Sequence, residues 1–116
     1  MPPNTLPVGV SFADPGLAAL YLNAPVTKTT SFTLGDTENY VICNGAASIT
    51  VTLPPAAGNA GRSVFIKTIA AQTVVSASTN VAPIGSATLG TAILAGAAGN
   101  WALLVCDGAN WVIMAS

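Results

Sequence analysis

Charged side chains are scarce in this sequence of 116 residues: Lys and Arg number three, Asp and Glu number four, and histidine is absent. Charged residues make up 6% of the chain, whereas an ordinary soluble domain contains roughly 25%. The absence of histidine excludes Ser-His-Asp and Cys-His catalytic arrangements. Three cations are too few for the many phosphate contacts of a nucleic-acid-binding protein. We therefore expect no enzyme, no cofactor and no nucleic-acid partner.

Long uninterrupted apolar segments are also missing. The region between Lys67 and Asp107 carries no charge, but Ser, Asn, Gln, Pro and Gly residues interrupt it. A membrane-spanning helix needs about 20 predominantly apolar residues, so we expect no membrane partner. Residues 1–7 lack the positive region and the apolar core of a secretory signal. The protein is therefore expected in a reducing cytoplasm.

Metal ligands and disulfide frameworks are poorly represented. The spacing between Cys43 and Cys106 matches no zinc pattern, and a reducing compartment favours buried free thiols over a disulfide between them. Asp36 and Glu38 form the only close acidic pair, and two carboxylates fall short of the six to eight oxygen ligands of calcium. We interpret this pair as part of a solvated turn and expect no metal.

What the sequence does contain is apolar: 52% of its residues are hydrophobic. With so few charges, the outside of a single domain has only Ser, Thr, Asn, Ala and Gly to cover it. A net charge near zero promotes association between copies. The composition therefore favours an obligate homo-oligomer or a component of a larger assembly over a neutral monomer.

The first 26 residues differ from the rest and predict an N-terminal arm (1–26). They contain five of the eight prolines, which favour extended chain. Asp14 is a candidate cap for a short helix that places Leu17, Leu20 and Tyr21 on one face. Such an arm suits docking on a neighbouring subunit, and the alternatives are a strand extension or a frayed chain end.

Residues 27–116 show the pattern of an all-β domain. Short apolar runs alternate with Gly, Asn and Pro turns, which predicts an antiparallel β-sandwich or a small barrel. Asn44-Gly45 is typical of a β-hairpin turn. The predicted strands cover 27–34, 39–44, 48–55, 62–69, 72–78, a short 82–89, 91–96, 101–106 and 111–115.

The final hairpin is apolar on both faces. Trp101, Leu103 and Val105 point one way, and the residues between them, also apolar, point the other. Asp107-Gly108-Ala109-Asn110 is interpreted as the turn that joins the strands at 101–106 and 111–115. A strand with two apolar faces needs cover on both. We expect one tryptophan, Trp101 or Trp111, in the core and the other at a subunit contact.

Two segments of the sequence resemble a β-module that recurs in tailed-bacteriophage structural proteins, including tail fibres, tail spikes and small virion proteins. They read ASITVTLPPAAGNAGRSVFIKTIA and, further on, LLVCDGANWVIM. The resemblance covers residues 27–116 and depends on five matching pairs of adjacent residues. These are Leu53-Pro54, Gly61-Arg62, Ile66-Lys67, Asp107-Gly108 and Asn110-Trp111.

The resemblance implies a virion protein that forms a homotrimer and is not an enzyme. Because the chain runs from Met1 to Ser116 as a free-standing module with an arm, we expect a capsid decoration (cement) protein. It would be made in the host cytoplasm and bind the major capsid protein on the capsid surface. Candidate subunit or capsid contacts are Leu17, Leu20, Tyr21, Arg62, Trp101 and Trp111. The alternative is a receptor-binding or lectin-like trimeric domain of a tail fibre or spike, displaying Trp101, Trp111, Tyr40 or Tyr21.

Overall fold

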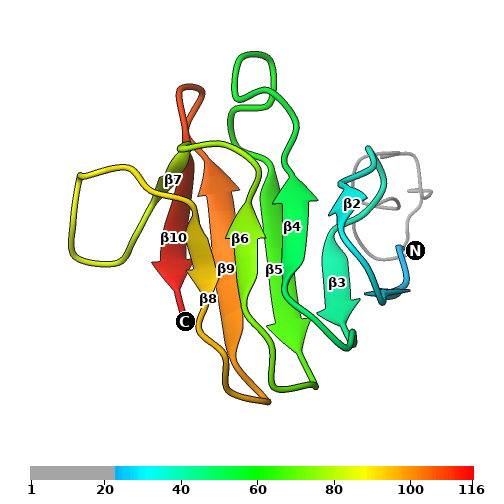
Figure 1. Cartoon of the computed structure of the whole chain (residues 1–116). Helices are drawn as coiled ribbons and strands as arrows, with labels where there is room; N and C mark the ends of the chain where they lie inside the picture. The colour runs from blue at the N-terminus through cyan, green and yellow to red at the C-terminus, as the bar shows by residue number, and fades with distance from the viewer. Residues whose placement is uncertain (1–22) are drawn as a thin grey trace, which may run out of the picture.

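The computed structural model describes residues 23–116, and this part of the chain is all-β and contains no helix. Ten strands form two packed sheets, one of six strands and one of four (Figure 1). The six-stranded sheet has the order β1 (Val26–Lys28), β3 (Tyr40–Cys43), β5 (Ser63–Thr68), β9 (Trp101–Cys106), β10 (Trp111–Ala115), β7 (Val81–Ala82). The four-stranded sheet has the order β2 (Phe32–Thr33), β4 (Ile49–Thr52), β6 (Val74–Ser76), β8 (Ala92–Leu94).

Successive strands alternate between the two sheets as far as β9. The odd-numbered strands up to β9 enter the six-stranded sheet and the even-numbered ones up to β8 enter the four-stranded sheet. After each crossing to the other sheet, the chain crosses back and adds a strand beside its previous one. Consequently β1, β3 and β5 pair as parallel neighbours in one sheet, and β2, β4 and β6 do so in the other. The first six strands therefore wind as coils around a shared interior.

The sandwich predicted from the sequence is confirmed, but its strand pairing is mixed. Five of the eight strand pairs are parallel. The strand expected over residues 27–34 is divided into β1 and β2, which lie in different sheets. The hairpin expected at Asn44-Gly45 is wrong, because the chain leaves β3 there and crosses to β4 in the other sheet.

The crossing at Gly45 is held by a buried glutamine. The backbone N–H of Gly45 donates to Oε1 of Gln72 at 2.7 Å, and the side-chain amide of Gln72 donates to the carbonyl of Ala47. A Cβ added at Gly45 would lie 2.5 Å from the carbonyl oxygen of Thr29. A glycine is therefore required at position 45 because two chain segments approach each other closely there. In a hairpin turn the reason would be different, namely a backbone with a positive φ.

The C-terminal hairpin has the strands and the turn that the sequence predicts. β9 and β10 pair antiparallel, with Trp111 opposite Cys106. In the turn, Oδ1 of Asp107 accepts hydrogen bonds from the N–H groups of Ala109 at 2.9 Å and Asn110 at 2.7 Å. These two bonds, that to Asn110 foremost, lower the pKa of the Asp107 carboxyl. Asp107 is thus a turn residue.

The core lies between the two sheets and is almost entirely aliphatic. Alternate residues of each strand point into it, as the burial of Val64 and Ile66 in β5 shows. Both cysteines are buried and free, as expected from the sequence. The largest fully buried side chains are Trp111, Ile49, Ile66, Leu104, Val41, Val51, Val64, Val74 and Val81.

The predicted N-terminal arm lies mostly outside the described residues. This applies to the helix expected after Asp14 and to the candidate contacts Leu17, Leu20 and Tyr21. β1 begins at Val26, which is the last residue of the arm as predicted.

Candidate interaction surface

The outer face of the six-stranded sheet is apolar. In β9, Ala102, Leu104 and Cys106 are buried, so the intervening residues point away from the core. The same alternation holds in β3, β5 and β10. We call the resulting surface the apolar face. Its apolar members are Tyr40, Ile42, Phe65, Ile69, Trp101, Leu103, Val105, Val112 and Met114, and the polar residues Ser63 and Lys67 of β5 lie among them.

Strand register makes this face continuous. Tyr40 on β3 is aligned with Phe65 on β5, which is aligned with Leu103 on β9. Val105 on β9 is aligned with Val112 on β10. Residues aligned across neighbouring strands lie on the same face in contact distance. The face therefore crosses four strands without a gap.

An aromatic pair lies within the apolar face. The rings of Phe65 and Trp101 are stacked, with centroids 5.2 Å apart and an interplanar angle of 8°. Trp101 nevertheless remains 36% exposed, and Tyr40 is 41% exposed. The stack fixes the indole on the sheet, so it presents a rigid surface to a partner.

Exposed apolar side chains are concentrated around Trp101. Ile69, which follows β5, is 53% exposed, and Met114 in β10 is 61% exposed. A pocket of about 400 Å³ adjoins Trp101 and is also lined by Leu94 of β8 and Asn100. We call Ile69, Trp101 and Met114 the Trp101 end of the apolar face. The pocket lies beside this end and is lined mostly by β8 of the other sheet and by the segment before β9.

The outer face of the four-stranded sheet has a different chemistry. Thr33 is aligned with Thr52, and both are exposed. Ser31, Thr50 and their neighbours line a shallow hollow of about 370 Å³ there. Hydroxyl groups satisfy their hydrogen bonds with water, so this face is compatible with solvent in a way that the apolar face is not.

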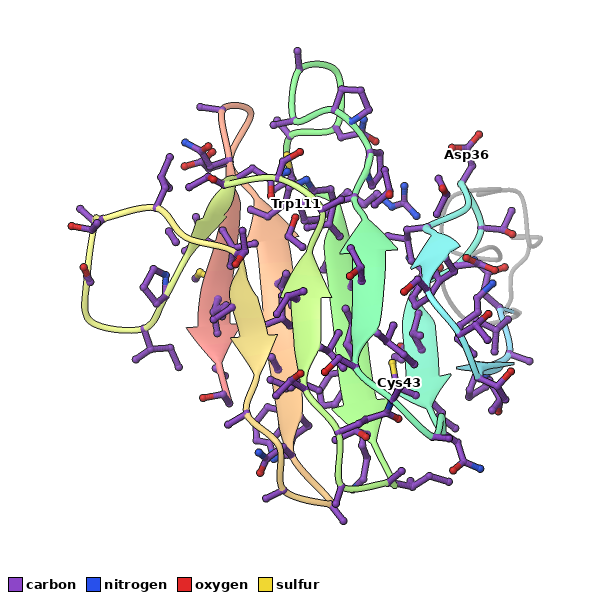
Figure 2. All side chains as sticks on the ribbon, in the orientation of Figure 1. Asp36, Cys43 and Trp111 are labelled. Atoms are coloured by element: carbon purple, nitrogen blue, oxygen red, sulfur yellow. The ribbon has the colours of Figure 1, made fainter. Side chains whose placement is uncertain are left out.

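Four of the six charged side chains of the described residues, those of Lys28, Asp36, Glu38 and Arg62, lie around the loop between β2 and β3. Nζ of Lys28 donates to Oε2 of Glu38 at 2.8 Å. This bond, and next a bond from the N–H of Gly35, lower the pKa of the Glu38 carboxyl. Arg62 donates to the backbone carbonyls of Gly35 and Glu38. These groups hold the loop between β2 and β3, and Asp36 lies at its tip (Figure 2).

The structure separates the predicted contact residues. Trp101 lies on the apolar face. Trp111, which is labelled in Figure 2, is 0% exposed, and its Nε1 donates to the carbonyl of Pro54 at 3.0 Å. Trp111 as a contact residue is thus wrong, because its indole fills the space between the sheets. The guanidinium of Arg62 is engaged within its own chain, and whether it also reaches a partner stays a prediction.

Four exposed apolar residues were absent from the candidates, namely Ile69, Ile84, Leu89 and Met114. Met114 has the outward position in the apolar pattern of its strand. Ile84 and Leu89 lie in the loop between β7 and β8, where the sequence predicts a short strand. Their exposure depends on the direction in which that loop leaves the sheet. The alternation of apolar and polar residues along the sequence does not indicate this direction.

Residues 23–116 show no cluster of three or more His, Cys, Asp or Glu side chains that would hold a metal ion. The buried thiol of Cys43 has its pKa raised to about 11 by desolvation. Among the described residues no helix is long and apolar enough to span a membrane.

No family model matches the chain, and searches of curated proteins and of solved structures return no match.

Proposed function

We propose that this protein is a bacteriophage virion structural protein, a capsid decoration (cement) protein that forms a trimer on the capsid surface and stabilises the shell. The apolar face is the observation that carries the proposal. It leaves Trp101, Met114 and their neighbours in contact with water on an isolated subunit. A contiguous apolar patch of this kind is typical of a surface that another protein covers.

The nature of the contacts suggests how such a protein would act. The face contains one charged side chain, Lys67, aligned with Trp101. Attachment would therefore depend on apolar and backbone contacts, which salt does not screen. A symmetric trimer seated across neighbouring capsomers binds through several contacts at once, so weak single contacts sum to a stable attachment.

The test uses phage shells that lack the protein, to which the purified full chain is added at low salt and at about 1 M salt. We expect the same occupancy in both, and loaded shells that withstand a higher temperature than bare shells. Release at high salt, or no binding at either concentration, would contradict the proposal. The copy number in intact particles gives a second readout, with hundreds expected.

The second candidate is a receptor-binding or lectin-like trimeric domain of a tail fibre or spike. The pocket beside Trp101 favours it, because an aromatic ring beside a hollow is a common sugar platform. Phe65 already covers one face of that indole, and Nδ2 of Asn100 donates to the carbonyl of Ala95. Few free polar groups remain to orient a sugar. A handful of copies per particle, with binding to host glycans, would favour this candidate.

A further inference from the structure

A projecting loop carries the exposed apolar residues that do not belong to the apolar face. It runs from Ala82 to Leu89, between β7 and β8, and extends away from the sandwich in Figure 1. Ile84 in this loop is 55% exposed and Leu89 is 36% exposed. The loop contains no charged residue. It is thus an apolar projection that its own subunit does not cover.

The loop is held in one conformation. At its base, the N–H and C=O groups of Val81 and Gly90 exchange two hydrogen bonds, of 3.0 and 2.8 Å. At its tip, the N–H of Ser86 donates to the carbonyl of Pro83, and Gly85 has a φ of 81°. This is the geometry of a type II turn, which places Ile84 at the corner. A preordered loop loses little conformational entropy on binding.

We propose that in the trimer this loop of one copy packs against the Trp101 end of the next copy, with Ile84 and Leu89 facing Ile69, Trp101, Met114 and the adjoining pocket. The inference deepens the proposed function, on which it rests for the trimeric state, by naming the surfaces that join the subunits. Each copy both donates a loop and receives one, so the contact is heterologous and closes as a ring.

The size of the apolar face argues for including the loop. The four strands that the apolar face crosses, about 4.8 Å apart and about five residues long, cover a projected area of roughly 300 Å². Stable interfaces bury about 800 Å² on each partner. The apolar face alone is therefore small for a lasting contact, and the loop supplies additional apolar surface on the partner side.

Charge argues against the simplest alternative, in which two apolar faces pack on each other about a two-fold axis. Such a contact would bring together two copies of Lys67 on a face without any acidic side chain. Buried cations without a counter-ion are strongly unfavourable. Lys67 is aligned with Trp101 and therefore lies at the same end of the face. A loop is narrower than a second sheet, so the ammonium group of Lys67 can stay in water beside it.

Cross-linking between cysteine variants of the full chain tests the arrangement. Leu89→Cys and Met114→Cys are made singly and together, and the proteins are treated with a short bis-maleimide. The native thiols Cys43 and Cys106 are buried and stay unreactive under native conditions. We expect the double variant to give covalent trimers and neither single variant to cross-link. The matched control Leu89→Cys with Thr33→Cys, on the hydroxyl-bearing face, should give none.

Other cross-linking results would overturn the inference. Covalent dimers from Met114→Cys alone would show that two apolar faces meet about a two-fold axis. A double variant that remains a monomer, although the wild-type chain scatters light as a trimer, would place the loop elsewhere. Because both readouts use purified protein without shells, a failure to bind capsids would contradict the proposed function but not the loop contact.

Association measurements on charge variants give an independent check. Ile84→Asp and Met114→Asp should each lower the association constant at least ten-fold, whereas Thr33→Asp should leave it unchanged. All three positions are exposed, so circular dichroism spectra and melting temperatures of the variants should match those of the wild type at monomeric concentrations. Unchanged association in the Ile84 variant would exclude the loop from the interface.

Discussion

Replacing Trp111 with phenylalanine tests the assignment of the two tryptophans most directly. The indole is fully buried, and its Nε1 donates to the carbonyl of Pro54 at 3.0 Å. Phenylalanine leaves that carbonyl without a donor, which costs about 1–3 kcal/mol. The smaller ring also removes buried apolar surface and leaves a void worth about 1 kcal/mol. We expect the free energy of unfolding to fall by about 2–4 kcal/mol in total.

The matched control is Trp101→Phe. That indole is partly exposed and stacked on Phe65, and a phenyl ring retains most of the stack. Its expected cost to the subunit is below about 1 kcal/mol. Thermal unfolding, measured at concentrations where both variants are monomers, distinguishes their losses of stability. Each kcal/mol of lost stability lowers the melting temperature by about 4 °C in a domain of this size. Equal losses in the two variants would refute the assignment of Trp111 to the core and Trp101 to the surface.

Three further predictions concern single side chains. Gly45→Ala should lower the melting temperature more than Gly58→Ala. The Cβ added at position 45 would meet the backbone of Thr29. Gly58 has a φ of 84° and open space around it, so alanine there costs only local backbone strain. Glu38 has a lowered pKa in the folded state, so its stabilising effect is present above pH about 4.5 and is lost as the pH falls through the folded pKa. Urea unfolding of wild type and Glu38→Gln should therefore differ at pH 7 and converge in acid; a constant difference would contradict this. Cys43, with a pKa raised to about 11, should resist alkylation at pH 8 until the chain is unfolded in denaturant, which mass spectrometry detects.

Strand positions could be predicted wherever inward and outward residues alternate. The pattern Ile49, Val51 and Leu53 places β4, and all three side chains are buried. Which sheet a strand joins could not be predicted, because both sheets bury one face and produce the same alternation. Asn44-Gly45 ends a strand in either arrangement, so the local sequence did not distinguish a hairpin from a crossing between layers.

The candidate surface could be predicted in outline but not in orientation. The turn at Asp107 aligns Trp111 with Cys106, so alternation along β9 places Trp101 on the opposite face. Which face is inside is decided by β5. Its polar residues Ser63 and Lys67 are aligned with Val105 and Trp101, which marks that side as the outside. That signal appears only once β5 and β9 are known to be neighbours.

The proposed loop contact also predicts how the trimer assembles. One contact covers five partly exposed side chains, namely Ile69, Ile84, Leu89, Trp101 and Met114. Burying the roughly half of each side chain that is still exposed contributes about 1 kcal/mol per side chain, or about 5 kcal/mol for the contact. A dissociation constant of 1 μM requires about 8 kcal/mol, so a pair of subunits joined by a single contact is weak.

Ring closure changes this balance, because the third subunit forms two contacts for one loss of translational and rotational freedom. We therefore expect assembly to pass from monomer to trimer without an appreciable population of dimer. Sedimentation velocity over a hundred-fold range of concentration should show two boundaries. Mixing a variant such as Met114→Asp with wild type interrupts the ring and should increase the monomer at the expense of the trimer. A dominant dimer of the wild-type chain would instead indicate a two-fold contact, in which the loop from Ala82 to Leu89 has no role.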